Sequence, residues 1–140
     1  MEFKLTGEEF LKNREDAFAD NQEVVYVISC LDDEQSSTKR AIGRVLANDN
    51  DGILYIGRAS NVGRLVTLLL SIRDGNNGKN HSFGIRYKDN QSFRAKFPLE
   101  LLSIRLLSSA ESRELETRKL REYVEVFGEL PPLNHSANRE

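Results

Sequence analysis

The sequence predicts a small mixed α/β (α+β) domain, in which a central mixed or antiparallel β-sheet packs against helices. Two stretches, residues 23–31 and 101–108, are rich in β-branched and other apolar side chains, which is typical of buried strands. A third stretch, residues 110–127, repeats apolar side chains at the spacing of an amphipathic helix. The length of 140 residues suits one core, so we expect a single domain over residues 1–140.

The first half of the chain is expected to contain a helix and three strands. Thr6 followed by Glu9 has the spacing of a capping box, which predicts a helix through about Ala19, within an N-terminal extension of about residues 1–22. The buried strand over residues 23–31 and a polar loop follow. We expect the next two strands, residues 41–46 and 53–56, to form a hairpin because the turn-forming Asn-Asp-Asn-Asp-Gly separates them.

The second half is expected to contain two long helices and one strand. Asn61 can cap a helix that runs to about Arg73, and a loop rich in glycine and asparagine follows it. Residues 81–87 have no assigned element. The strand over residues 101–108 leads into the last helix, which ends at Gly128 before two prolines.

Composition excludes several classes of protein. The chain holds one cysteine, Cys30, so it forms no internal disulfide and no cysteine zinc cluster, which suits a reducing compartment. Charged side chains precede any apolar run at the N-terminus, and the apolar stretch at residues 66–70 is too short for a membrane span. We therefore expect a cytoplasmic protein without a signal peptide or a membrane partner.

The charges are distributed unevenly along the chain, although the net charge is only −2. Residues 1–34 hold three basic and ten acidic side chains, and residues 35–99 hold eleven basic and four acidic. Residues 100–140 hold six basic and eight acidic. The basic middle segment can form a positive surface for a nucleic acid, and a solvated surface with uneven charge explains it equally well.

Glu116 occupies an unusual position on the last helix. At about 100° per residue, with Leu115 at zero, Glu116 shares a sector between about 80° and 140° with Leu120, Tyr123 and Phe127. A carboxylate on this apolar stripe must be paired, protonated or bound to a cation, and a salt bridge to an arginine is the simplest alternative. The remaining glutamates fall on the opposite side and are expected to face solvent: Glu111, Glu114, Glu122 and Glu125.

A strand-to-helix junction is the second feature that chemistry could use. The residues Tyr55-Ile56-Gly57-Arg58 end a strand with a glycine, just before the helix that Asn61 caps. Glycine permits a close backbone approach, and a basic residue beside a helix N-terminus can bind phosphate. Gly57 and Arg58 are therefore candidate phosphate- or DNA-binding residues, although a junction of this kind is common.

Together these features resemble the GIY-YIG nuclease family over about residues 23–134. The family's motifs occur in its order, as Val24-Val25-Tyr26, Tyr55-Ile56-Gly57, Leu115-Glu116 and Pro131-Pro132-Leu133-Asn134. The chain is similar in particular to a small subgroup through residues 49–57, 81–84 and 127–134, whereas Val24 replaces the first glycine of the first motif. The resemblance implies the family's fold and metal-dependent cutting of a nucleic acid, with DNA the expected substrate.

The arginine of the family's site is shifted in this chain. The family places it ten positions after the tyrosine of the second motif, which is Leu65 here, whereas Arg64 lies one position earlier. One residue turns a side chain by about 100° on a helix, so Arg64 serves only if the helix begins sooner. Otherwise the site is damaged or another arginine substitutes; the alternatives are Arg58, Arg73 and Arg86.

The resemblance also implies roles for the motif residues. Glu116 would hold one divalent metal ion, Mg²⁺ or Mn²⁺. Water molecules and phosphate oxygens would complete the coordination of that ion. Tyr26 would accept a proton from the attacking water, Tyr55 would orient water or phosphate, and Arg64 would stabilise the transition state. Core packing is the competing interpretation for both tyrosines.

The remaining candidates lie in loops and at strand edges. His81 is expected to relay a proton or contact phosphate, with a loop cap as the alternative. Asn134 is expected to tie the C-terminal loop to the site as structural support. Lys39, Arg40 and Arg44 are expected to follow the DNA backbone, with a solvated loop and strand as the alternative.

Three functions are compatible with these patterns. The first is a DNA endonuclease that hydrolyses phosphodiester bonds by in-line attack of water. The second is a catalytically degenerate GIY-YIG module that binds nucleic acid or a protein without cutting, as the shifted arginine and the lost glycine suggest. The third is a plain protein-interaction domain.

Overall fold

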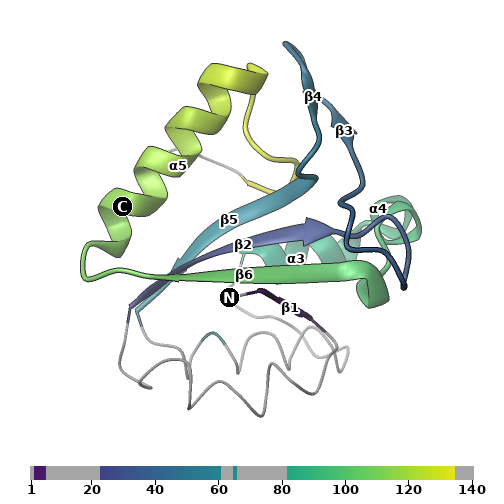
Figure 1. Ribbon diagram of the computed structural model, residues 1–140, viewed down its shortest axis with the longest axis horizontal. Coiled ribbons are helices and arrows are strands. Elements are labelled where there is room, and N and C mark those ends of the chain that lie inside the picture. The colour runs from purple at the N-terminus through teal and green to yellow at the C-terminus, as the bar shows by residue number, and fades with distance from the viewer. Residues whose placement is uncertain (1, 6–22, 61–64, 66–81, 135–140) are drawn as a thin grey trace.

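The computed structural model describes residues 2–5, 23–60, 65 and 82–134, and its centre is a four-stranded antiparallel sheet (Figure 1). The strands lie in the order β1-β6-β2-β5. The strand bounds are Glu2–Lys4 (β1), Val24–Cys30 (β2), Ile42–Gly43 (β3), Asn48–Asp49 (β4), Ile53–Ala59 (β5) and Leu102–Ser108 (β6). The short strands β3 and β4 pair separately from this sheet.

Helices cover the sheet and complete the mixed α/β architecture that the sequence predicts. The described helices are α3 (Ser82–Asp89), α4 (Gln91–Lys96) and α5 (Ser112–Phe127), with a 3-10 turn at Leu99–Leu101. Figure 1 shows α5 above the sheet and α3 and α4 behind it. The predicted helices of the N-terminal extension and of the segment after Asn61 lie outside the described residues, apart from Leu65.

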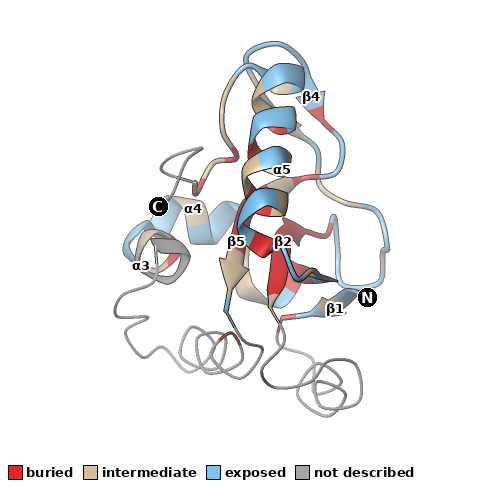
Figure 2. Cartoon of the chain, turned by 90° about the vertical axis from the view of Figure 1, so that its left-hand side faces the viewer, coloured by how far each residue is buried: buried red, intermediate tan, exposed pale blue. Residues whose placement is uncertain are grey.

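Both faces of the sheet are covered, which produces two hydrophobic cores. Successive strand residues point to opposite faces, so Tyr26 faces one core while its neighbours Val25 and Val27 face the other. Aromatic side chains of α3 and α4 belong to the first core, and Leu120 of α5 belongs to the second. We call the two sides the tyrosine face and the α5 face. Figure 2 shows β2 as a continuous band of buried residues between them.

The predicted hairpin is wrong in its pairing. β5 pairs with β2, while the strand expected over residues 41–46 shortens to β3 and pairs with β4. The reason is a tight turn in which the Asp49 carboxylate accepts backbone hydrogen bonds from Asp51 at 2.9 Å and Ile53 at 3.0 Å. Gly52 lies in this turn at a φ of 58°, a backbone angle that residues with a side chain rarely adopt.

The strongly periodic segments are confirmed, and the short ones differ. The helix expected over residues 110–127 forms α5, and Gly128 ends it at a φ of 82°. The unassigned segment 81–87 contributes to α3, and β1 has too few residues to leave a sequence pattern. In the described part of the chain, no helix is long and apolar enough to cross a membrane.

Candidate active site

Tyr26 and Tyr55 lie side by side on the tyrosine face. The strand register pairs Tyr26 with Gly57 and Ile28 with Tyr55, so the two tyrosines project from neighbouring strands to the same side. Their ring centroids are 5.9 Å apart and the rings are inclined by 35°. Tyr26 is 0% exposed and Tyr55 is 1% exposed. The two phenols that the sequence singles out are therefore neighbours within the core.

Gly57 makes room for both rings. A Cβ at this position would lie 2.6 Å from the Tyr26 hydroxyl oxygen and 2.6 Å from Cε2 of Tyr55, far inside van der Waals contact. The Tyr26 ring therefore leans from β2 across β5, and its hydroxyl lies above the backbone of Gly57. Because β5 is the outermost strand of the described sheet, this hydroxyl is carried toward the sheet edge.

The C-terminal segment closes part of that edge. Ile56 donates its backbone N–H to Oδ1 of Asn134 at 2.9 Å, and Nδ2 of Asn134 donates to the carbonyl of Ile56 at 2.9 Å. The backbone N–H of Leu133 donates to the carbonyl of Leu54 at 2.9 Å. The segment thus pairs with β5 much as another strand would, directly beside Tyr55 and Gly57.

Two arginines hold this segment from different elements. Arg86 of α3 donates from Nη1 to the carbonyl of Leu133 at 2.7 Å. Arg44, which follows β3, donates from Nη2 to the carbonyl of Leu130. Leu130 packs into the α5-face core and Leu133 into the tyrosine-face core, so the segment crosses the edge of the sheet between them.

Glu116 belongs to the opposite side of the sheet. It is 4% exposed on α5, one turn before Leu120, which packs against Val25, Val27 and Ile56. The predicted buried stripe is thus confirmed, and the glutamates expected to face solvent are exposed: Glu111, Glu114, Glu122 and Glu125. Glu116 and the two phenols therefore approach β5 from different faces. Groups on these faces can meet only around the outer edge of this strand.

Glu116 is named in the sequence analysis as the ligand of one divalent cation. Among the described residues, no group of three or more His, Cys, Asp or Glu side chains could hold a metal ion. A single carboxylate can be the protein's ligand to an ion such as Mg²⁺, which keeps several waters and takes further oxygen ligands from a phosphate. Glu116 is the residue that would hold such an ion.

The cations expected to follow DNA are engaged within the protein. Lys39 pairs with Glu2, and burial lowers the pKa of the Lys39 ammonium. Arg40 donates to the carbonyls of Lys96 and Asp32. Arg44 pairs with Glu129 at 3.0 Å, and its side chain is only 12% exposed. The structure therefore gives these three residues intramolecular partners and does not gather them into an open surface.

The alternative arginines lie at different places. Nη1 of Arg58 is 3.7 Å from a carboxylate oxygen of Glu23 and 3.4 Å from Oγ of Ser112, the first residue of α5. Its partner in the β2 register, Val25, faces the α5 core, so Arg58 lies away from the tyrosine pair. Arg86 contacts the C-terminal segment. Arg64, Arg73 and His81 lie outside the described residues.

Asp49 is a residue that the sequence analysis did not single out. It is buried, and Oδ2 of its carboxylate accepts a hydrogen bond of 2.8 Å from the hydroxyl of Tyr123 on α5. Burial, followed by this hydrogen bond, raises the pKa of Tyr123 well above its ordinary value. In the sequence, the position of Asp49 at the start of the 49–57 motif was the feature that could have identified it. Asp49 thus joins the turn before β5 to the helix that carries Glu116.

Comparisons with models of known families, with curated proteins and with solved structures find no match to this chain. The chemistry of the site therefore has to be inferred from its own residues. These are a pair of buried phenols packed over a glycine on an edge strand, and a buried carboxylate on the helix across that strand.

Proposed function

We propose that the chain is a GIY-YIG-type endonuclease that hydrolyses DNA phosphodiester bonds by in-line attack of water. The observation that carries the proposal is the packing of Tyr26 and Tyr55 over Gly57. Gly57 leaves the space over β5 that both rings fill. The glycine lets the Tyr26 hydroxyl reach the edge strand, where a reacting group can be positioned.

The residues divide the chemistry between them. Tyr26 accepts a proton from the attacking water, which requires a cation nearby because a free phenol has a pKa of about 10. Tyr55 orients the water or the phosphate. Glu116 would hold a divalent ion, Mg²⁺ or Mn²⁺, and that ion would supply positive charge opposite the phosphate and the leaving oxygen. This arrangement needs Glu116 to meet the phosphate around the outer edge of β5.

Two further roles follow from the resemblance alone. Arg64 holds the phosphate by a bidentate contact and stabilises the charge of the transition state. His81 relays a proton or contacts the phosphate. Each role is tested by replacing the residue and measuring cleavage in the same assay.

A cleavage assay with Mg²⁺ or Mn²⁺ on a mixture of labelled DNA duplexes, forks and flaps tests the proposal. We expect Glu116→Gln to reduce the cleavage rate by about 100-fold or more, because the metal supplies several kcal/mol of transition-state stabilisation. Glu114→Gln, on the exposed side of the same helix, is the matched control and should cut at the wild-type rate. Equal rates for wild type and Glu116→Gln would refute the mechanism.

A second function is a module of the same fold that binds without cutting. It is favoured by the complete burial of both phenols, since a phosphate reaches their hydroxyls only after the covering residues shift. This function predicts DNA binding that weakens with salt and no metal-dependent cleavage. In that case Glu116→Gln changes the stability of the fold and leaves binding unaltered.

A further inference from the structure

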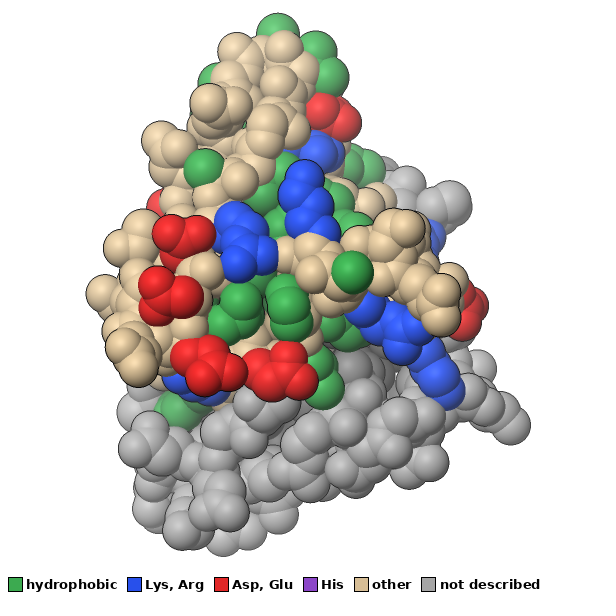
Figure 3. Space-filling view, turned by 90° about the vertical axis from the view of Figure 1, so that its right-hand side faces the viewer, with side chains coloured by type: hydrophobic (Ala, Val, Ile, Leu, Met, Phe, Trp, Pro, Cys, Tyr) green, Lys and Arg blue, Asp and Glu red, His purple; other side chains and the backbone are tan. Residues whose placement is uncertain are grey.

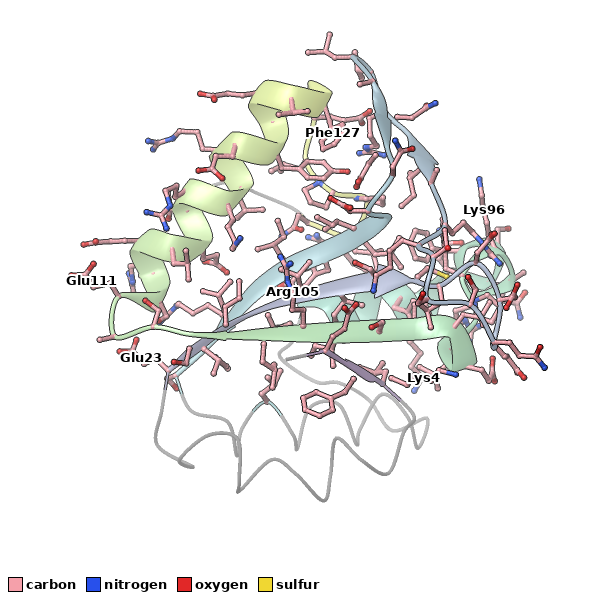
Figure 4. All side chains as sticks on the ribbon, viewed as in Figure 1. Lys4, Glu23, Lys96, Arg105, Glu111 and Phe127 are labelled. Atoms are coloured by element: carbon pink, nitrogen blue, oxygen red, sulfur yellow. The ribbon has the colours of Figure 1, made fainter. Side chains whose placement is uncertain are left out.

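Helix α4 carries two exposed cations that have no carboxylate partner in the part of the chain that the structure describes. Arg94 and Lys96 are exposed, and among the described residues no carboxylate lies within ion-pair distance of either. Figure 4 shows Lys96 at the outer border of the molecule. The cations that the sequence analysis assigned to DNA, together with Arg58, have carboxylate partners: Lys39, Arg40, Arg44 and Arg58.

The segment of the sequence that contains α3 and α4 is rich in basic side chains. Residues 82–97, which contain α3 and α4, hold four basic side chains and one acidic side chain, a net charge of +3. The sixteen residues of α5 hold four basic and four acidic side chains, a net charge of zero. Figure 3, which views the molecule from the right-hand side of Figure 1, shows basic side chains at several places on this face and acidic side chains both grouped near one border and elsewhere. A polyanion would therefore be attracted to α4 more strongly than to α5.

Helix α4 has no buried residue of its own and is anchored through the half-buried Phe93 and its C-cap, Phe97. Phe93 and Phe97 pack into the core of the tyrosine face, with their ring centroids 4.8 Å apart. The hydroxyl of Tyr87 on α3 donates to the carbonyl of Phe97 at 2.7 Å, and Asn90 caps the helix by accepting from the N–H of Phe93. The exposed face of α4 is thus a fixed surface on the side of the sheet that carries the tyrosine pair.

Helix stability alone does not explain this composition. Basic residues in the last turn interact favourably with the helix dipole, by roughly 0.3–1 kcal/mol each. The same dipole favours acidic residues in the first turn, and neither α3 nor α4 has one. The composition omits the stabilising acids and keeps the cations, which is the pattern expected of a surface that meets negative charge.

We propose that the exposed face of α4 binds the sugar-phosphate backbone of a nucleic acid, with Arg94 and Lys96 contacting phosphates. The inference rests on the nucleic-acid substrate of the proposed function, and it does not require that the chain cuts. Phosphate contacts of this kind fix the orientation of a duplex without reading its sequence. They would place the backbone along the tyrosine face.

Fluorescence anisotropy with a labelled DNA duplex in EDTA, at a series of KCl concentrations, tests this surface without any cleavage. The slope of log K against log salt concentration is negative, and each lost phosphate contact reduces its magnitude by about one. We expect the double variant Arg94→Gln, Lys96→Gln to reduce this magnitude by about two. The double variant Arg113→Gln, Arg121→Gln removes two exposed charges from α5 and should keep the wild-type slope.

The outcomes separate this inference from the proposed function. Absence of wild-type binding, an unchanged slope in the α4 variant, or an equal loss in the α5 variant overturns the α4 surface. Loss of slope only in the α4 variant supports it, even if the wild type fails to cut DNA with Mg²⁺. Cutting by a wild type whose binding does not depend on α4 would keep the nuclease and remove this surface. A thermal melt of each variant confirms that it is folded.

Discussion

The side-chain amide of Asn134 takes both backbone hydrogen bonds that Ile56 offers at the outer edge of β5. The Ile56 N–H donates to Oδ1 and the Ile56 carbonyl accepts from Nδ2, each at 2.9 Å. An asparagine side chain can do this because it carries a donor and an acceptor in the spacing of a peptide group. The strand that holds Tyr55 and Gly57 is thereby supported by a residue 78 positions after Ile56 in the sequence.

Replacing Asn134 with alanine should destabilise the protein. The change leaves the N–H and the carbonyl of Ile56 without these partners, at a cost of about 1–3 kcal/mol if water does not replace them. Urea unfolding measures this loss, and faster hydrogen exchange at the Ile56 amide localises it. Asn48→Ala, at an exposed position of β4, is the control and should stay within about 0.5 kcal/mol. Unaltered exchange at Ile56 would show that the side chain does not support the strand.

Gly57→Ala should disturb the tyrosine pair. The new methyl group would lie 2.5 Å from Cζ of Tyr26, and the buried rings have little space to withdraw, so we expect a loss of about 1–3 kcal/mol. Gly43→Ala is the matched control, because the nearest atom to its added methyl is 3.7 Å away. Chemical denaturation and the near-ultraviolet circular dichroism of the tyrosines check both variants. Equal stability of the two variants would contradict the packing described for Gly57.

Local sequence patterns predict the long elements and miss the pairings. The buried strand β2 and the helix α5 each repeat apolar residues over enough positions to identify the element, and Gly128 marks the end of the helix. The partner of β5 is not a local property, since it depends on the turn that Asp49 and Gly52 build. The helix α4 has only six residues and no buried one, so its pattern carries little information.

The same reasoning explains which parts of the site the sequence could predict. The helical period identifies Glu116 as a buried acid, and the structure agrees. The period does not say which face of the sheet receives α5, because β2 is buried on both faces and shows no alternation. That Tyr26 and Tyr55 are neighbours can be deduced only from the β2–β5 register, which the sequence does not give.

Tyr123→Phe should remove part of the alkaline sensitivity of the fold. The pKa of Tyr123 is raised in the folded state, so above about pH 10 the unfolded chain loses a proton that the folded protein keeps. The stabilisation is therefore complete below about pH 10 and declines as the pH rises further, by up to about 1.4 kcal/mol per pH unit. The variant has no Tyr123 hydroxyl to ionise, so its free energy of unfolding should decline less with rising pH than that of the wild type.

Urea unfolding of wild type and Tyr123→Phe at a series of alkaline pH values measures the difference. Near neutral pH the variant should be less stable by about 1.5–3 kcal/mol, because it loses a hydrogen bond to the Asp49 carboxylate. The gap should narrow above about pH 10. Tyr87, whose pKa burial also raises, contributes equally to both proteins. A gap that stays constant with pH would show that Tyr123 ionises alike in both states.

Tyr26→Phe separates a catalytic hydroxyl from a packing ring. The substitution keeps the aromatic ring that lies over Gly57, so the fold should survive, as a thermal melt can confirm. If the hydroxyl accepts the proton of the attacking water, DNA cleavage with Mg²⁺ should fall by about 10²–10⁴-fold. The acid limb of the pH–rate profile should also change, because the group whose ionisation it reports is gone. Tyr55→Phe, which removes the neighbouring hydroxyl, should lower the rate less and keep that limb, since the role proposed for Tyr55 is to orient the reactants. If Tyr26→Phe cut DNA at the wild-type rate with an unchanged profile, the hydroxyl would be a packing feature, and the proton acceptor would have to be another group.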